Sequence, residues 1–242
     1  MFPRASLAAI SLHLLAHAPT VSAALENSTE CVDVHFMVAR GSTMTYPGFP
    51  YDVFESVAAN MTATTNYENI IYPATNETAT DSYFLGRAAA GAQVNAYAEA
   101  CPDSKIVLGS YSQGCLIVGD ALAGGGGHEY YLGNSTAPLI TEANGKNIIA
   151  NIFFGNPRHI PYENYDFGAN PLNATGYQID NLDSRYSGII GDWCNYGDSV
   201  CSPAATNFLA LHTAYDADYS TVAAEWTLEK IGQYASAKAT DS

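Results

Sequence analysis

Short apolar runs alternate along this chain with longer stretches in which apolar residues recur every three or four positions. The short runs are bounded by Gly, Pro or Asn, which is typical of buried strands, whereas the longer spacing is typical of amphipathic helices. Strands that alternate with helices predict an α/β fold in which helices cover both faces of a parallel sheet. We expect strands at residues 32–39, 69–72, 106–111, 148–154 and 186–190, and helices at residues 51–64, 82–100, 115–123 and 219–234.

The N-terminal residues differ in character from the rest of the chain. Arg4 precedes an apolar run, and the small residues at 21–23 stand where a secretory signal is usually cleaved. A buried N-terminal helix is the alternative, and Pro19 disfavours it. We therefore expect a signal peptide at residues 1–23, a secreted, extracellular protein, and a single domain at residues 24–242.

The composition is strongly acidic. Only 9 Lys and Arg residues oppose 24 Asp and Glu residues, which gives a formal net charge of −15. Nucleic acids and anionic membranes are bound by clusters of Lys and Arg. We therefore expect neither as a partner, and we expect the protein to act as a monomer.

Five cysteines occur in the chain. In a secreted protein they favour disulfides, and the closeness of Cys194 to Cys201 favours that pair. A bridge from Cys31 to Cys101 would close a long loop, which leaves Cys115 as a buried, unreactive thiol in an apolar helix. Because no close cluster of Cys and His has ligand spacing, we expect no zinc site and no other metal.

In a secreted protein, glycosylation sequons are also informative. An Asn-X-Ser/Thr sequon in a secreted chain marks an expected surface position. Five occur, at Asn27, Asn60, Asn76, Asn134 and Asn173.

Ser112 is the candidate nucleophile. An apolar strand ending at Tyr111 runs into a sharp turn and then into a helical segment, as in the nucleophile turn of an α/β-hydrolase. The usual pattern, Gly-X-Ser-X-Gly, has Gly at both ends. Gly114 fits it, but Ser110 replaces the first Gly, and Gly109 stands one position too early.

A serine hydroxyl needs a base and a group that orients the base. His212 is the candidate base, because it follows the last candidate strand in the order that this fold uses, and His159 is the competing histidine. Asp198 is the candidate acid, because its loop is short and bounded by cysteines; Asp183 and Asp192 are the competing carboxylates. An ordinary turn aspartate is the structural alternative for Asp198.

The transition state of acyl transfer also needs donors for an oxyanion. One should be the backbone N–H of Gln113, the residue after the nucleophile. The loop after the first strand should supply the other, from Ser42, whose hydroxyl could add a further donor. A simple turn is the alternative interpretation of that loop.

Five segments in this order resemble the cutinase and acetylxylan esterase family over about residues 31 to 235. They are Ala39-Arg-Gly-Ser-Thr43, Tyr111-Ser-Gln-Gly114, Gly155-Asn-Pro-Arg158, Gly197-Asp198 followed by Cys201, and His212-Thr-Ala-Tyr215. The resemblance implies a small lidless α/β-hydrolase, a three-layer sandwich with about five parallel strands. It also implies a secreted esterase that acts on plant cuticle or acetylated xylan without a cofactor.

The resemblance assigns roles to individual residues. It implies a nucleophile at Ser112, an acid at Asp198, a base at His212 and oxyanion groups at Ser42 and Gln113. It implies disulfides Cys31–Cys101 and Cys194–Cys201. The chain departs from the family pattern at Ser110, Cys115 and Asn156.

These features predict a secreted serine carboxylic-ester hydrolase whose partner is an ester-bearing polymer or a small ester. The alternative is a non-catalytic wall-binding or host-interaction protein on the same scaffold. An apolar rim would suit a fatty acyl chain, whereas the Tyr- and Asn-rich stretch at 162–177 would suit a sugar surface. The residues expected at that rim are Met44, Tyr46, Phe49, Phe208, Leu209 and Leu211.

Overall fold

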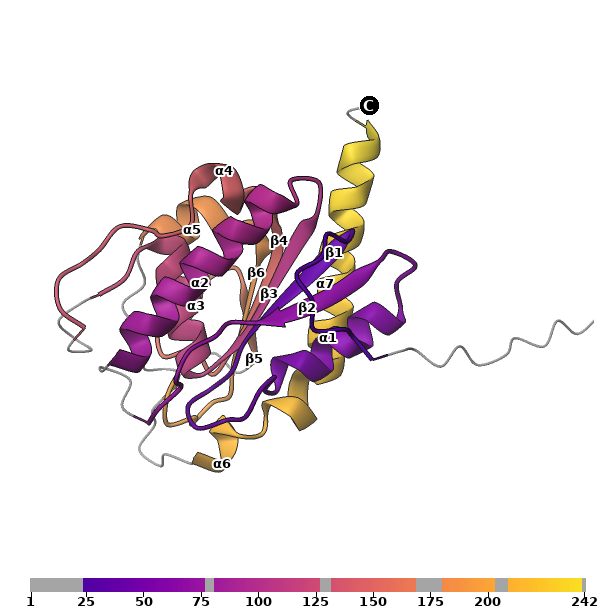
Figure 1. Ribbon diagram of the computed structural model, residues 1–242. Coiled ribbons are helices and arrows are strands. Elements are labelled where there is room, and N and C mark those ends of the chain that lie inside the picture. Colours follow the sequence, from indigo (N-terminus) through magenta and orange to yellow (C-terminus); the bar gives the residue numbers. More distant parts are fainter. Residues whose placement is uncertain (1–23, 77–80, 127–131, 169–179, 203–208, 241–242) are drawn as a thin grey trace, which may run out of the picture.

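A parallel sheet forms the centre of the computed structural model (Figure 1), which describes residues 24–76, 81–126, 132–168, 180–202 and 209–240. In this part of the chain the sheet has six strands in the order β2-β1-β3-β4-β6-β5, and every neighbouring pair is parallel. The strands are β1 (Val34–Ala39), β2 (Thr65–Asn69), β3 (Lys105–Tyr111), β4 (Ile148–Phe154), β5 (Asp166–Gly168) and β6 (Ile190–Cys194).

Helices cover both faces of this sheet and make three layers (Figure 1). Helices α1 (Pro50–Ala59) and α7 (Tyr215–Thr240) pack together on one face. On the other face α3 (Gln113–Ala123) packs between α2 (Asp81–Ala100) and α5 (Asp180–Tyr186). Shorter helices are α4 (Glu142–Gly145), α6 (Leu209–His212) and a 3₁₀ turn (Ser187–Ile189). The expected α/β three-layer architecture is therefore confirmed.

Alternate residues of each central strand contribute to two separate cores. Ile106 and Leu108 of β3 point into the core beneath α2 and α3, whereas Val107 points into the core beneath α1 and α7. All residues of β1 and β4 are buried, because both faces of the sheet are covered. This explains why these strands appear in the sequence as continuous apolar runs.

Two strands lie at other residues than the sequence analysis predicted. The sequence predicted a strand at 69–72, but the chain forms β2 at Thr65–Asn69, and Ile71 is 61% exposed in the loop that follows. Apolar periodicity could not detect β2, because its buried side chains include the polar Asn66 and Glu68, which contact His35 of β1.

The second misplaced strand was predicted at 186–190. Those residues end α5 and form the 3₁₀ turn, and β6 begins at Ile190. The buried Asp192 interrupts the apolar pattern of β6. The three-residue β5, in a stretch rich in polar and aromatic residues, was also not predicted and raises the sheet from about five strands to six.

Both expected disulfides are present, Cys31–Cys101 and Cys194–Cys201. Cys115 is free and 1% exposed, as expected. Four sequons, at Asn27, Asn60, Asn76 and Asn134, lie at exposed positions.

The remaining sequon, Asn173, and the expected signal peptide lie outside the described residues. Among the described helices, none combines the length and the apolar character needed to span a membrane.

Removing the Cys31–Cys101 bridge should lower the free energy of unfolding by about 4 kcal/mol, because the bridge restrains a long loop of the unfolded chain. Urea denaturation of a Cys31→Ser/Cys101→Ser variant measures this loss. Cys115→Ala is the matched control: it removes a buried sulfur that closes no loop and should cost about 1 kcal/mol. Equal losses in the two variants would contradict the expectation.

Candidate active site

Ser112 lies in a strained turn between β3 and α3. Its backbone has φ +55° and ψ −119°, a conformation that non-glycine residues rarely adopt and that functional turns can hold. The close packing around the turn explains why glycine stands at two positions beside it. A Cβ on Gly114 would lie 2.2 Å from the carbonyl oxygen of Ala39, and one on Gly109 would lie 2.4 Å from the ring of Phe54.

Ser110, which replaces the usual glycine, is accommodated in this turn. It pairs with Ala39 of β1 and Phe153 of β4 and is fully buried. Its hydroxyl has no hydrogen-bond partner among the described residues. The substitution therefore leaves the turn intact at the cost of an unsatisfied buried hydroxyl.

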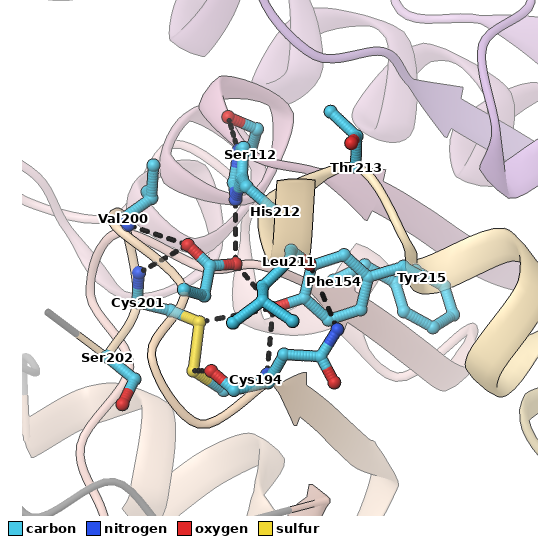
Figure 2. Close-up of polar contacts among 12 residues, drawn as sticks. Ser112, Phe154, Cys194, Val200, Cys201, Ser202, Leu211, His212, Thr213 and Tyr215 are labelled. Carbon is cyan, nitrogen blue, oxygen red and sulfur yellow. Dashed lines mark hydrogen bonds and ion pairs between the residues drawn. A yellow bond between two sulfur atoms is a disulfide. The ribbon is translucent and has the colours of Figure 1, made fainter. Parts of the chain in front are cut away.

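The imidazole of His212 lies between the Ser112 hydroxyl and the Asp198 carboxylate (Figure 2). His212 Nε2 is 2.9 Å from Ser112 Oγ, and His212 Nδ1 is 2.8 Å from Asp198 Oδ2. Three residues that are far apart in the sequence thus form one hydrogen-bonded chain. In this arrangement the imidazole can accept the hydroxyl proton while the carboxylate fixes its tautomer.

Asp198 is fully buried and accepts hydrogen bonds at both carboxylate oxygens. Oδ1 accepts from the backbone N–H of Val200 at 2.6 Å, and Oδ2 accepts from the Tyr215 hydroxyl at 2.6 Å (Figure 2). Burial by itself would raise the pKa of Asp198. The hydrogen bonds from His212, Tyr215 and Val200, with the charge of His212, outweigh burial and hold that pKa below its usual value.

Tyr215 is a positioning residue to which sequence reasoning gave no role. Its hydroxyl donates to Asp198 and accepts from the backbone N–H of Asn195 at 3.0 Å. The sequence signal was its place three residues after His212, where α7 begins.

The ring of His212 is held from two further sides. The Tyr111 hydroxyl donates to the carbonyl oxygen of His212 at 2.6 Å, and the two rings stack with centroids 5.1 Å apart. Gly155 has φ +60°, and a Cβ there would lie 2.7 Å from Cε1 of His212. Only glycine allows the end of β4 to pass this close to the imidazole.

The side chain of Gln113 connects the start of α3 to the loop after β1. Its Nε2 donates to Ser42 Oγ at 3.2 Å and to the carbonyl oxygen of Thr75 at 3.0 Å. Its Oε1 accepts from the Ser82 hydroxyl at 2.8 Å. The sequence singled out Gln113 for its backbone N–H alone, whereas the side chain also fixes the position of Ser42.

A cavity of about 270 Å³ lies beside His212. Met44 and Phe49, two of the residues expected at an apolar rim, line it together with Ser42 and Tyr111. Of the other expected rim residues, Tyr46 lies instead over the guanidinium of Arg40, Leu209 is 66% exposed, Leu211 is partly buried, and Phe208 lies outside the described residues.

Two of the competing residues, His159 and Asp192, are not part of this hydrogen-bonded chain. His159 and Asp192 pair with each other at 3.1 Å and are both buried. The side chain of Asp183, the other competing carboxylate, lies outside what the structure describes.

Replacing Tyr215 with Phe should lower the free energy of unfolding by about 2 kcal/mol at neutral pH, because Asp198 loses a donor and the N–H of Asn195 loses its acceptor. The pKa of Asp198 is lowered in the folded state, so its contribution is present above the unfolded carboxyl pKa and disappears as the pH falls. The difference from the unsubstituted protein should therefore shrink between pH 7 and about pH 3.

Calorimetry over this pH range tests the expectation. Tyr219→Phe is the matched control, because the Tyr219 ring packs against Tyr215 but makes no described hydrogen bond to Asp198. A difference that stays constant with pH would count against the role assigned to Tyr215.

Comparisons with known proteins find a family and several relatives that resemble this chain. The family model described as Cutinase matches residues 30–231. An acetylxylan esterase of Hypocrea jecorina is 30% identical over 78% of this chain and 64% of its own length, so this chain spans less than two thirds of that relative. Cutinase 11 of Verticillium dahliae is 27% identical over 91% of this chain and 76% of its own length.

A solved structure is also similar. The catalytic core domain of acetyl xylan esterase from Trichoderma reesei superposes with a TM-score of 0.73 at 27% identity, covering 84% of this chain and 99% of that domain. The resemblance noted in the sequence is therefore confirmed over most of the chain. The protein belongs to the cutinase family.

Proposed function

We propose that this protein is a serine carboxylic-ester hydrolase with Ser112 as nucleophile, His212 as base and Asp198 as the carboxylate that orients the base. The observation that carries the proposal is the continuous chain of hydrogen bonds from Ser112 Oγ to Asp198 Oδ2 through both nitrogens of one imidazole. The names of the relatives, which include acetylxylan esterase and cutinase, support the same chemistry.

The reaction proceeds through an acyl-enzyme. His212 Nε2 takes the proton of Ser112 as Oγ attacks the ester carbonyl carbon, and the same nitrogen then gives that proton to the leaving alcohol. Water repeats the sequence with His212 again as base and releases the acid. Asp198 keeps the Nδ1 proton in place and stabilises the imidazolium that forms at each step.

The backbone N–H groups of Ser42 and Gln113 stabilise the oxyanion of the tetrahedral intermediate. Loss of one such donor typically costs about 3–4 kcal/mol of transition-state stabilisation, so the position of the Ser42 loop controls the rate. Gln113 fixes that loop through its side-chain hydrogen bond to Ser42 Oγ.

The substrates are esters of the plant cell wall or cuticle, of the acetylxylan or cutin type, and the enzyme meets them outside the cell. Two disulfides and four exposed sequons are consistent with secretion. A cavity of about 270 Å³ beside His212, lined by Met44 and Phe49, has room for a short acyl group. We therefore favour short acyl esters.

A fluorophosphonate probe should label the protein at Ser112, because phosphonylation requires an activated hydroxyl. Ser112→Ala should abolish labelling and lower kcat for p-nitrophenyl acetate by about 10⁴-fold or more. Ser110→Ala is the matched control, since that neighbouring hydroxyl lies outside the hydrogen-bonded chain. Mass spectrometry of the labelled peptide locates the adduct.

If the folded protein is not labelled, it is a non-catalytic member of the family, such as a wall-binding or host-interaction protein.

Ester chain length distinguishes the two substrate types. If the cavity beside His212 holds the acyl group, kcat/KM for p-nitrophenyl esters should fall at least tenfold between four and eight acyl carbons. Met44→Ala, which enlarges that cavity, should recover part of the activity on the longer ester. A rate that rises with chain length would instead favour cutin-type esters.

A further inference from the structure

A second cluster of ionisable side chains lies near the same edge of the sheet. His159 follows β4, Asp166 begins β5, and Asp192 lies in β6. His159 Nδ1 is 3.1 Å from Asp192 Oδ2 and 3.8 Å from Asp166 Oδ1, and the three side chains are only 1–3% exposed. The cluster takes no part in the hydrogen-bonded chain of Ser112, so the proposed reaction leaves it unexplained.

Some polar atoms of this cluster have no hydrogen-bond partner among the described residues. They are Oδ1 of Asp192 and Nε2 of His159, whereas Nδ1 of His159 and Oδ1 of Asp166 have contacts only within the cluster. A buried polar atom without a partner is costly and calls for an explanation. Each of the three side chains thus has at least one ligand atom available.

One oxygen of each carboxylate also accepts a hydrogen bond from a neighbouring group. Asn156 Nδ2 donates to Asp192 Oδ2 at 3.0 Å, and the backbone N–H of Glu163 donates to Asp166 Oδ2 at 2.9 Å. Partners of this kind orient metal ligands in proteins. With Asp166 Oδ2 bound in this way, the other oxygen of Asp166, Oδ1, faces His159 Nδ1 at 3.8 Å.

The cluster also carries an excess of negative charge. Among the described residues neither carboxylate pairs with Lys or Arg, and the nearby Arg158 pairs with Asp120, with Nε 2.6 Å from Oδ1. A cation bound at this position would offset the charge of the two buried carboxylates.

We propose that His159, Asp166 and Asp192 bind a divalent cation of the zinc type. One ligand atom from each residue lies within 4.8 Å of the others. A metal about 2.1 Å from His159 Nδ1, Asp192 Oδ2 and Asp166 Oδ1 would have angles of about 95° and 130° at the two measured separations, which bracket the tetrahedral value. One imidazole and two carboxylates suit zinc better than calcium, which prefers six to eight oxygen ligands.

The chain supplies three ligands, so a water molecule would complete a tetrahedral site, and the bound cation would hold neighbouring segments together. It joins the segment after β4 to β5 and β6, and β6 leads directly into the loop that carries Asp198. Because His159 must be neutral to bind a cation, binding should weaken as the pH falls.

Titration of the untagged, disulfide-bonded protein with Co²⁺, after removal of metals by a chelator, tests the proposal. We expect one equivalent to bind with the visible absorption of a tetrahedral Co²⁺ site, Zn²⁺ to displace it, and Zn²⁺ to raise the melting temperature. Absence of stoichiometric binding to the folded protein would overturn the proposal, whatever the variants do.

Variants locate the site. His159→Gln and Asp192→Asn should each weaken Co²⁺ binding by about 100-fold or more, and Asn156→Ala by about tenfold. Glu68→Gln is the matched control, because it alters another buried His–carboxylate pair, with His35, and should leave binding unchanged. Ser112→Ala should also bind Co²⁺ normally, which separates this site from the proposed hydrolysis. Equal binding in His159→Gln and the unsubstituted protein would place the metal elsewhere.

Discussion

A carboxylate removed from water is strongly unfavourable unless hydrogen bonds and an opposite charge compensate for it. Asp198 is in that position, with no exposed surface and acceptor contacts at both oxygens. Its donors come from the disulfide-closed loop that carries it and from His212 and Tyr215, so both segments must be in place before the charge is stable. The geometry at Ser112 depends on this arrangement, because Asp198 orients the imidazole that reaches the hydroxyl.

The loop from Cys194 to Cys201 and the first turn of α7 therefore act together. Tyr215 hydrogen bonds to Asp198 and to the backbone of Asn195, and Tyr111 binds the carbonyl oxygen of His212 from the opposite side. These contacts join the sheet to the helical layer on one of its faces, since Tyr111 ends β3 and Tyr215 begins α7. Residues of the core that these two layers enclose thus also hold the site.

Apolar periodicity predicts the buried centre of this fold well and its polar edges poorly. The run at 148–154 matched β4 residue for residue, because both faces of that strand are covered by apolar groups. Strand β2 was misplaced, because its buried positions are Asn and Glu satisfied by hydrogen bonds to His35. Strand β6 was misplaced because its centre carries Asp192.

The candidate site shows the same division. Ser112, Asp198 and His212 could be proposed from the sequence because their order, and the turn around Ser112, are those of the α/β-hydrolase fold. Tyr215 received no role, because its place three residues after His212 does not by itself show that its hydroxyl reaches Asp198. The cluster of His159 with Asp166 and Asp192 was also missed. Ligand spacing in sequence detects local motifs, whereas these residues meet because β5 pairs with β6 beside the segment that follows β4.

The free thiol of Cys115 can report on the opening of the structure around Ser112. Its sulfur lies under the nucleophile turn, 3.3 Å from the carbonyl oxygen of Phe154, and burial, followed by the charge of Asp192, raises the pKa of the thiol. A thiol held in this way reacts with a soluble reagent only when α3 moves away from the sheet. The rate of its modification therefore measures how often the segment that carries Ser112 opens in the folded protein.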